Sequence, residues 1–215
     1  MLVNFAGSAL IIIDVQNDFC PGGAMAVEDG EGVIEPLNHL SSLFSGKSGR
    51  VIATQDWHPA DHVSFTSSHE NKNSGDTISL IGIDNQILWP SHCVQDSLGA
   101  DFHAALDPKP VSLIIRKGFR KSIDSYSAFF ENDHVTSTGL DGFLKALSID
   151  TLVLGGLATD YCVFYSAIDA VKLGYKTIVA SDAIRGVNFP EGSVEKAIRL
   201  LGESGVILAE SKDIQ

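Results

Sequence analysis

The sequence predicts an α/β protein with three layers and a mostly parallel sheet. Short apolar runs alternate with segments whose apolar residues recur every three or four positions, which predicts strands and helices joined by right-handed crossovers. The apolar runs lack the polar alternation of a strand with one solvated face, and this is typical of strands buried on both faces of a parallel sheet. Because the chain has 215 residues and 44% of them are hydrophobic, we expect one well-buried domain over residues 1–215.

Composition narrows the possible partners and the compartment. The net charge of −12, from 27 acidic and 15 basic residues, argues against nucleic-acid and membrane partners because no basic patch can dominate the surface field. The 3 cysteines, an odd number, favour reduced thiols over a disulfide framework. The first apolar run, residues 9–13, is too short to span a membrane and lacks the basic flank of a secretion signal. We therefore expect a cytoplasmic protein.

The first strand is expected over residues 9–15, and it carries a carboxylate, Asp14, near its carboxyl end. Open α/β sheets place their ligand crevice at that end of the strands, so Asp14 is a candidate for function as well as for a turn or a helix cap. The G-x-G-x-x-G sequence of dinucleotide-binding proteins does not follow this strand, and a dinucleotide cofactor therefore loses its main support. A helix is expected next, over residues 33–44.

A possible metal site follows the second strand, which is expected over residues 50–55. In extended backbone, residues two apart point the same way, so Asp56 and His58 project together. A carboxylate with an imidazole suits zinc, manganese or iron, but two ligands are too few to hold an ion. The candidates for a third ligand are His62, His69 and His92.

Residues 67–88 are polar and lose both the helical and the strand period, which predicts a long loop that serves as a lid or a binding segment. This segment leads into an aromatic residue and a histidine, Trp89 and His92. A third buried strand is expected over residues 113–115. Lys117 follows it closely, which places another polar side chain at the carboxyl end of a strand.

A cysteine stands at the start of a helix later in the chain. The strand at residues 151–154 leads through a tight turn to Thr159, which suits a helix N-cap, and Cys162 then falls at about the third helical position. There the unpaired N–H groups and the helix dipole favour thiolate over thiol, as a nucleophile requires. The same cysteine can equally serve in packing, because free cysteine is often buried. The remaining elements are expected as helices over residues 140–147 and 194–201 and strands over residues 177–180 and 206–208.

Five short motifs, taken together, resemble one family. They are IIIDVQNDF at residues 11–19 followed by PGG, QDWHP at 55–59, WPSHC at 89–93, RKG at 116–118 and GGLATDYCV at 155–163. Their sequences and their order resemble the nicotinamidases, a branch of the isochorismatase-like cysteine hydrolases. The resemblance implies a six-stranded, mostly parallel sheet with the strand order 3-2-1-4-5-6. It also implies hydrolysis of nicotinamide, and of pyrazinamide, through a cysteine thioester, in the salvage of NAD.

The resemblance also implies a role for individual residues. The backbone N–H groups of Ala158 and Cys162 would form an oxyanion hole, beside a cis peptide between Leu157 and Ala158. One divalent ion is implied, zinc first and manganese or iron as alternatives, with waters completing its shell and with His62 and His69 outside it. Whether the protein forms a homo-oligomer is left open. The implied side chains are Asp14, Lys117 and Cys162 for the catalytic triad, Asp56, His58 and His92 for the metal, and Phe19, Trp89 and Tyr126 for an aromatic slot around nicotinamide.

The chemistry of amide hydrolysis agrees with these roles, and three other functions compete with them. Covalent catalysis needs a thiolate, a proton donor for the departing ammonia and donors aimed at the developing oxyanion. Cys162 and Asp14 would meet the first two needs, and Lys117 would favour the thiolate by Coulomb attraction. The alternatives are a cysteine hydrolase of another small amide, a metalloamidase whose ion activates water while Cys162 only packs, and a non-catalytic binding protein on the same scaffold.

Overall fold

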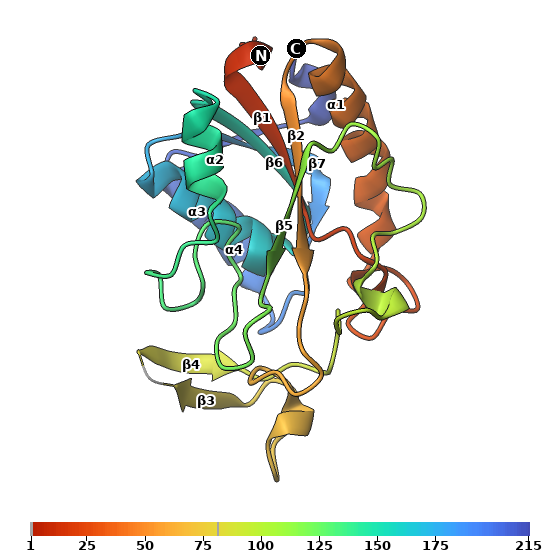
Figure 1. Ribbon diagram of the computed structural model, residues 1–215, viewed down its shortest axis with the longest axis vertical. Helices are drawn as coiled ribbons and strands as arrows, with labels where there is room; N and C mark the ends of the chain where they lie inside the picture. Colours follow the sequence, from red (N-terminus) through yellow and green to blue (C-terminus); the bar gives the residue numbers. More distant parts are fainter. Residues whose placement is uncertain (1, 81) are drawn as a thin grey trace.

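A parallel sheet between two layers of helices forms the body of the molecule, as the sequence predicts (Figure 1). The computed structural model describes residues 2–80 and 82–215. The central sheet has six strands, which are β1 (Ser8–Ile13), β2 (Arg50–Asp56), β5 (Leu113–Lys117), β6 (Thr151–Leu157), β7 (Lys176–Arg185) and β8 (Ile207–Ala209).

The strand order of this sheet is β5-β2-β1-β6-β7-β8, and each neighbouring pair is parallel. Counted along the chain within this sheet, the order is 3-2-1-4-5-6, so the predicted topology is confirmed. The order reverses direction between β1 and β6, which is where open α/β sheets form a ligand crevice.

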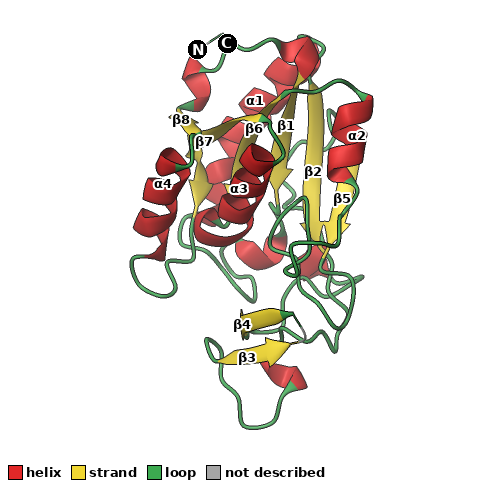
Figure 2. Ribbon diagram, turned by 90° about the vertical axis from the view of Figure 1, so that its left-hand side faces the viewer, coloured by secondary structure: helices red, strands yellow, loops and turns green. Residues whose placement is uncertain are grey.

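Helices cover both faces of the sheet (Figures 1 and 2), and among the described residues one lies on one face and three on the other. The single helix is α1 (Ile34–Gly46), and the other three are α2 (Leu140–Ala146), α3 (Phe164–Lys172) and α4 (Ser193–Glu203). Short 3-10 turns lie at Phe5–Gly7, Asn17–Phe19, Gly30–Val33, Thr66–Ser68, Leu98–Ala100 and Ser211–Asp213.

Strand β1 supplies both halves of the core, because successive side chains on a strand point to opposite faces. Leu10 and Ile12 belong to the apolar cluster that contains Leu37 of α1. Ile11 belongs to the cluster on the other face, with Ala167 of α3. All the residues of β1 are fully buried, which agrees with the continuous apolar run that predicts it.

The two ends of the sheet have different roles. The chain termini lie side by side at the amino end (Figure 1), where the Val3 N–H donates to the Gln215 carbonyl at 2.8 Å. The carboxyl ends of the strands face the opposite way, toward the segment that follows β2. No helix within residues 2–80 and 82–215 is long and apolar enough to cross a membrane.

The predicted loop at residues 67–88 is only partly a loop, and this prediction was wrong for its second half. A hairpin of β3 (Thr77–Leu80) and β4 (Ile83–Ile87) forms a separate two-stranded antiparallel sheet below the carboxyl ends of the main strands (Figure 2). The alternation of polar and apolar residues in β3 is too short to stand out in a polar segment. Its partner strand supplies the pairing that the local sequence does not reveal.

Two further expectations need correction. Strand β5 lies at the edge of the sheet and is not fully buried, since Ile114 is 47% exposed. Thr159 is not an N-cap, because the turn after β6 is a π-helical turn over Thr159–Val163 with Ala158 in extended backbone before it. Cys162 therefore lies in this turn, just before α3, and not in the first turn of a regular α-helix.

Candidate active site

Three polar side chains meet where β1, β5 and β6 end. Asp14 follows β1, Lys117 is the last residue of β5, and Cys162 lies in the turn after β6. The structure therefore brings together the three residues of the predicted triad, although the strands that carry them are far apart in the sequence. All three residues are at most 6% exposed.

Asp14 leaves the strand with an unusual backbone. Its φ of 48° lies in the left-handed region, which turns the side chain out of the regular alternation of β1. Thr54 of β2 fixes the carboxylate, since its hydroxyl donates to Asp14 Oδ1 at 2.6 Å and accepts from the Asp14 N–H at 3.2 Å. Thr54 therefore orients the carboxylate from the neighbouring strand.

Lys117 links the parts of the site. Its Nζ lies 2.8 Å from Asp14 Oδ2 and 2.5 Å from Asp56 Oδ1. The same ammonium group lies 3.3 Å from Cys162 Sγ and donates to the Ser125 carbonyl at 3.0 Å. A buried ammonium group with four partners has little freedom, so Lys117 fixes the spacing between the thiol and the two carboxylates.

Burial sets the resting protonation states of the triad. Burial raises the pKa of Asp14 to about 6, although Lys117 acts to lower it. Burial also raises the pKa of the Cys162 thiol well above its usual range, although Lys117 opposes this shift. Burial would lower the pKa of Lys117, but Asp14 and Asp56 outweigh it and raise that pKa. The resting pair at neutral pH is thus a thiol beside a carboxylate, whereas the helix-start argument predicts a thiolate.

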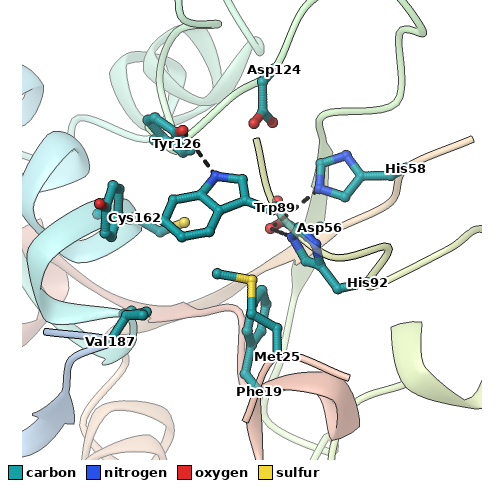
Figure 3. Close-up of a pocket in the computed structure, with 12 residues that line it drawn as sticks. Phe19, Met25, Asp56, His58, Trp89, His92, Asp124, Tyr126, Cys162 and Val187 are labelled. Carbon is teal, nitrogen blue, oxygen red and sulfur yellow. Dashed lines mark hydrogen bonds and ion pairs between the residues drawn. The ribbon is translucent and has the colours of Figure 1, made fainter. Parts of the chain in front are cut away.

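A second group of side chains lies beside the triad and has the atoms of a metal site. Asp56 Oδ2 lies 3.6 Å from His58 Nε2 and 3.9 Å from His92 Nε2 (Figure 3). The three ligand atoms all lie within 4.8 Å of one another, and all three residues are buried. Asp56 and His58 project together as the strand period predicts, and His92 supplies the third atom.

The surroundings of the two histidines fit a metal site. His58 Nδ1 hydrogen-bonds to the Gly118 carbonyl, and His92 Nδ1 hydrogen-bonds to the Pro90 carbonyl, each at 2.8 Å. A backbone carbonyl at Nδ1 fixes the tautomer and leaves Nε2 as the ligand atom, which is the usual second shell of a histidine metal site. Gly118 must be glycine here, because its φ is +63° and an added Cβ would lie 2.4 Å from the His58 ring.

Charge at the site also favours a cation. Asp14 and Asp56 are two buried carboxyl groups that share one ammonium group, that of Lys117. Burial lowers the pKa of His92 to about 4, so this ring is neutral and able to bind a metal at neutral pH. Burial would lower the pKa of His58, but Asp56 outweighs it and raises that pKa, so an ion would compete with a proton for this ring. A divalent ion held by a carboxylate and two imidazoles would offset the excess of negative charge. The donor set therefore fits zinc, manganese or iron by its chemistry.

The other two candidate histidines are occupied elsewhere. The ring nitrogens of His62 are both hydrogen-bonded, Nδ1 to Ser64 Oγ at 2.7 Å and Nε2 to the Ile123 carbonyl at 3.1 Å. His69 Nε2 hydrogen-bonds to the Val63 carbonyl at 2.7 Å. His62 does lie in a second group of ligand atoms, with His58 and Asp124. Its partners leave it less free to bind an ion than His92.

A pocket joins the thiol to the metal donors, and the predicted aromatic residues line it (Figure 3). Phe19, Trp89 and Tyr126 all contribute to its wall. The Trp89 indole N–H donates to the Tyr126 hydroxyl at 3.1 Å, which ties two of these rings together. The complete lining is Phe19, Met25, Asp56, His58, Trp89, His92, Asp124, Tyr126, Ala158, Tyr161, Cys162 and Val187.

Ala158 and Cys162, whose N–H groups are predicted to form an oxyanion hole, both line the same pocket. The peptide bond between Leu157 and Ala158 is cis, as the family resemblance implies. The Ala158 carbonyl accepts from the N–H groups of Tyr161 and Val163, each at 3.1 Å, so the chain wraps tightly around Cys162. The backbone of Ala158 and that of Cys162 therefore stand on either side of one short turn.

Sequence reasoning misses several residues that support the site. Gln16 holds the end of β2, because its amide donates to the Asp56 carbonyl and accepts from the Asp56 N–H, each at 2.8 Å. Asp124 lines the pocket next to His58, and it follows a segment with no strand or helix pattern. Thr54 has a sequence signal, since it lies two residues before Asp56 and faces the same side of β2. Gln16 has only its place in the motif at residues 11–19, and Asp124 has no sequence signal.

Comparisons with known proteins agree with this fold. A nicotinamidase of Acinetobacter baylyi is 47% identical over 206 residues, which cover 96% of this chain and 94% of that protein. The solved structure of an Acinetobacter baumannii nicotinamidase and pyrazinamidase is similar with a TM-score of 0.92 at 47% identity, over 97% of this chain and 98% of that one. A Pyrococcus horikoshii pyrazinamidase, solved in complex with zinc, has a TM-score of 0.78 at 30% identity, over 95% and 99% of the two chains.

The family itself is also identified directly. The model of the isochorismatase domain matches residues 8–213, which takes in the central sheet, the residues at its carboxyl edge and the pocket above them. Taken with the close likeness to the Acinetobacter proteins, this match shows that the chain belongs to the isochorismatase family.

Proposed function

We propose that this chain is a nicotinamidase, which converts nicotinamide and water to nicotinate and ammonia and also accepts pyrazinamide. The observation that carries the proposal is the contact of Lys117 with both Asp14 and Cys162 at a pocket that also contains a metal donor set. The names of the two Acinetobacter relatives support the same activity. Nicotinate from such a reaction would return to NAD by salvage.

The first half of the reaction forms a thioester. Asp14 takes the proton of the Cys162 thiol, and the sulfur attacks the carboxamide carbon of the substrate. The N–H groups of Ala158 and Cys162 stabilise the oxyanion that develops. Asp14 then returns its proton to the nitrogen of the leaving group, and ammonia departs as the carbon–nitrogen bond breaks. A carboxylate whose pKa is about 6 suits both directions of this proton transfer at neutral pH.

The second half releases the acid. Asp14 takes a proton from a water molecule, whose oxygen attacks the thioester carbon, and the carbon–sulfur bond breaks to give nicotinic acid and the Cys162 thiolate. The acid loses its carboxyl proton to solvent and leaves as nicotinate. The proton on Asp14 returns to the thiolate and restores the resting thiol. Lys117 stays charged throughout, because its pKa is raised by the two carboxylates beside it.

Asp56, His58 and His92 would hold one divalent ion, with zinc as our first choice, and the ion would supply a Lewis acid that binds the ring nitrogen of nicotinamide. The Pyrococcus horikoshii relative solved with zinc supports this choice. Phe19, Trp89 and Tyr126 would hold the planar ring between them, which turns its carboxamide toward Cys162.

The direct test is product analysis with purified protein. Incubation with nicotinamide should release ammonia and nicotinate in equal amounts, and pyrazinamide should release ammonia too. If neither amide yields ammonia while the protein is folded and loaded with metal, a different amide substrate or a binding role is favoured. Release of ammonia without nicotinate would mean a different bond is broken.

A further inference from the structure

The β3–β4 hairpin contributes one buried polar side chain to the back of the pocket. Within the described residues, 2–80 and 82–215, the hairpin pairs with no strand of the central sheet (Figure 2). Its strand β4 nevertheless carries Gln86, which is only 2% exposed, between the exposed residues Asn85 and Asp84 on one side and the half-buried Ile87 on the other. A buried glutamine on an otherwise open hairpin needs partners for its amide.

The amide of Gln86 reaches two residues that line the pocket. Its Nε2 donates to the Tyr126 hydroxyl at 3.2 Å and to Asp124 Oδ2 at 3.3 Å. The Tyr126 oxygen also accepts from the Trp89 indole at 3.1 Å. Gln86 therefore touches the aromatic wall and the carboxylate next to the metal donors, without lining the pocket itself.

A closed set of hydrogen bonds makes this attachment rigid. Gln86 Oε1 accepts from Asn132 Nδ2 at 3.0 Å, and Asn132 Oδ1 accepts from the backbone N–H of Tyr126 at 3.0 Å. Tyr126 is thus held at its backbone by Asn132 and at its hydroxyl by Gln86, and these two amides are bonded to each other. Such a network loses more than one bond when one member is removed.

We propose that Gln86 is a positioning residue for the amide substrate, acting through Tyr126, Trp89 and Asp124. This inference rests on the proposed function, because the aromatic wall is where the substrate ring would lie. Loss of the glutamine amide removes one of the two groups that donate to the Tyr126 hydroxyl, so this hydroxyl and the Trp89 indole that still bonds to it are less firmly held. The walls of the slot then move apart, and binding of the ring weakens while Cys162, Lys117 and Asp14 keep their contacts.

The test compares Gln86→Leu with Asp84→Ala, a control at an exposed residue of the same strand. Gln86→Leu should raise KM for nicotinamide about tenfold and leave kcat within about threefold, because the reacting groups are untouched. Alkylation of Cys162 by iodoacetamide and the metal content should match those of the wild type. The same variant in a Cys162→Ala background should bind nicotinamide about tenfold more weakly in calorimetry, which measures binding without turnover.

A double-mutant cycle separates positioning from general support of the fold. Tyr126→Phe removes the hydroxyl that Gln86 holds. The KM of the double variant should therefore be close to that of the single variant with the higher KM, and the increase should be far below the product of the two single increases. An effect of Gln86→Leu on thermal stability alone, with unchanged KM and binding, would overturn the inference. The inference would also be overturned if the two substitutions raised KM independently, so that their fold-increases multiplied in the double variant.

The two proposals fail in different ways. If the wild type neither hydrolyses nor binds nicotinamide, the proposed function is wrong and the assignment of Gln86 to its substrate falls with it. If the wild type is active and Gln86→Leu binds and hydrolyses nicotinamide like Asp84→Ala, only the inference about Gln86 is wrong.

Discussion

The ammonium group of Lys117 lies 2.8 Å from the carboxylate of Asp14, and neither side chain is exposed to solvent. An ion pair in this position is costly to break, because removing one partner leaves a buried charge without compensation. The pair thus joins the stability of the carboxyl edge of the sheet to its chemistry. Asp56 shares the same ammonium group, so a change at Lys117 reaches the metal donors as well.

Replacement of the lysine should therefore damage both folding and activity. Lys117→Met should lower the free energy of unfolding by about 3–5 kcal/mol and remove amide hydrolysis, because two buried carboxylates lose their partner. Denaturant titration and an ammonia assay measure the two effects. The matched control is Lys121→Met, which breaks an exposed pair with Asp61 and should leave both quantities close to the wild type. Equal stability of the two variants would contradict the account.

The pH dependence of the reaction should report on Asp14. This group must be ionised to accept the thiol proton, so protonation removes activity, and the raised pKa places that loss at about pH 6. We expect kcat/KM to fall about tenfold for each pH unit below that point. Metal content measured at each pH separates this effect from loss of the ion. A flat profile down to pH 5 with the metal retained would exclude Asp14 as the base.

Removal of a metal ligand should weaken substrate binding without disabling the thiol. Loss of a residue that only supports a metal ligand lowers metal affinity by up to about a hundredfold. Because His58 is a proposed direct ligand, His58→Ala should lower metal affinity by more than this and should raise KM for nicotinamide. His39→Ala, an exposed histidine on α1, is the matched control. Cys162 should still react with iodoacetamide in the metal-depleted variant. Loss of that reactivity would mean that the role of the ion is to organise the triad and not to bind the substrate.

The ring nitrogen of the substrate should matter if the ion binds it. Benzamide has nearly the size of nicotinamide but lacks this nitrogen, whereas pyrazinamide retains one at the equivalent place. We expect kcat/KM for benzamide at least about a hundredfold below that for nicotinamide, a loss near 2.7 kcal/mol, with pyrazinamide accepted. Similar values for benzamide and nicotinamide would point to an amidase that does not recognise the ring nitrogen.

The central fold follows from local patterns in the sequence. The buried strands β1 and β6 are recognisable as continuous apolar runs, and the amphipathic helices α1 and α4 by apolar residues every three or four positions. The alternation of the two patterns leaves little choice but a parallel sheet. Positions at strand ends, such as Asp14 and Lys117, can be found because the carboxyl edge of such a sheet is where ligands bind. The strand order, in contrast, comes from the resemblance to a family.

Features that depend on distant partners are not predictable in this way. The β3–β4 hairpin, Gln16 and Asp124 owe their positions to tertiary contacts and have no local pattern. The protonation state of Cys162 is a similar case, because the helix-start argument favours the thiolate whereas burial, which the sequence cannot reveal, favours the thiol.

Ammonia release from nicotinamide by the Cys162→Ala variant tests the central claim most directly. The comparison is with the wild type and with Cys20→Ala, which changes another buried thiol outside the pocket. We predict that Cys162→Ala folds, retains its metal and has less than about a hundredth of the wild-type rate, while Cys20→Ala stays active. Retention of a large part of the wild-type rate by folded Cys162→Ala would contradict the account and would favour a hydrolase in which a metal-bound water attacks the amide.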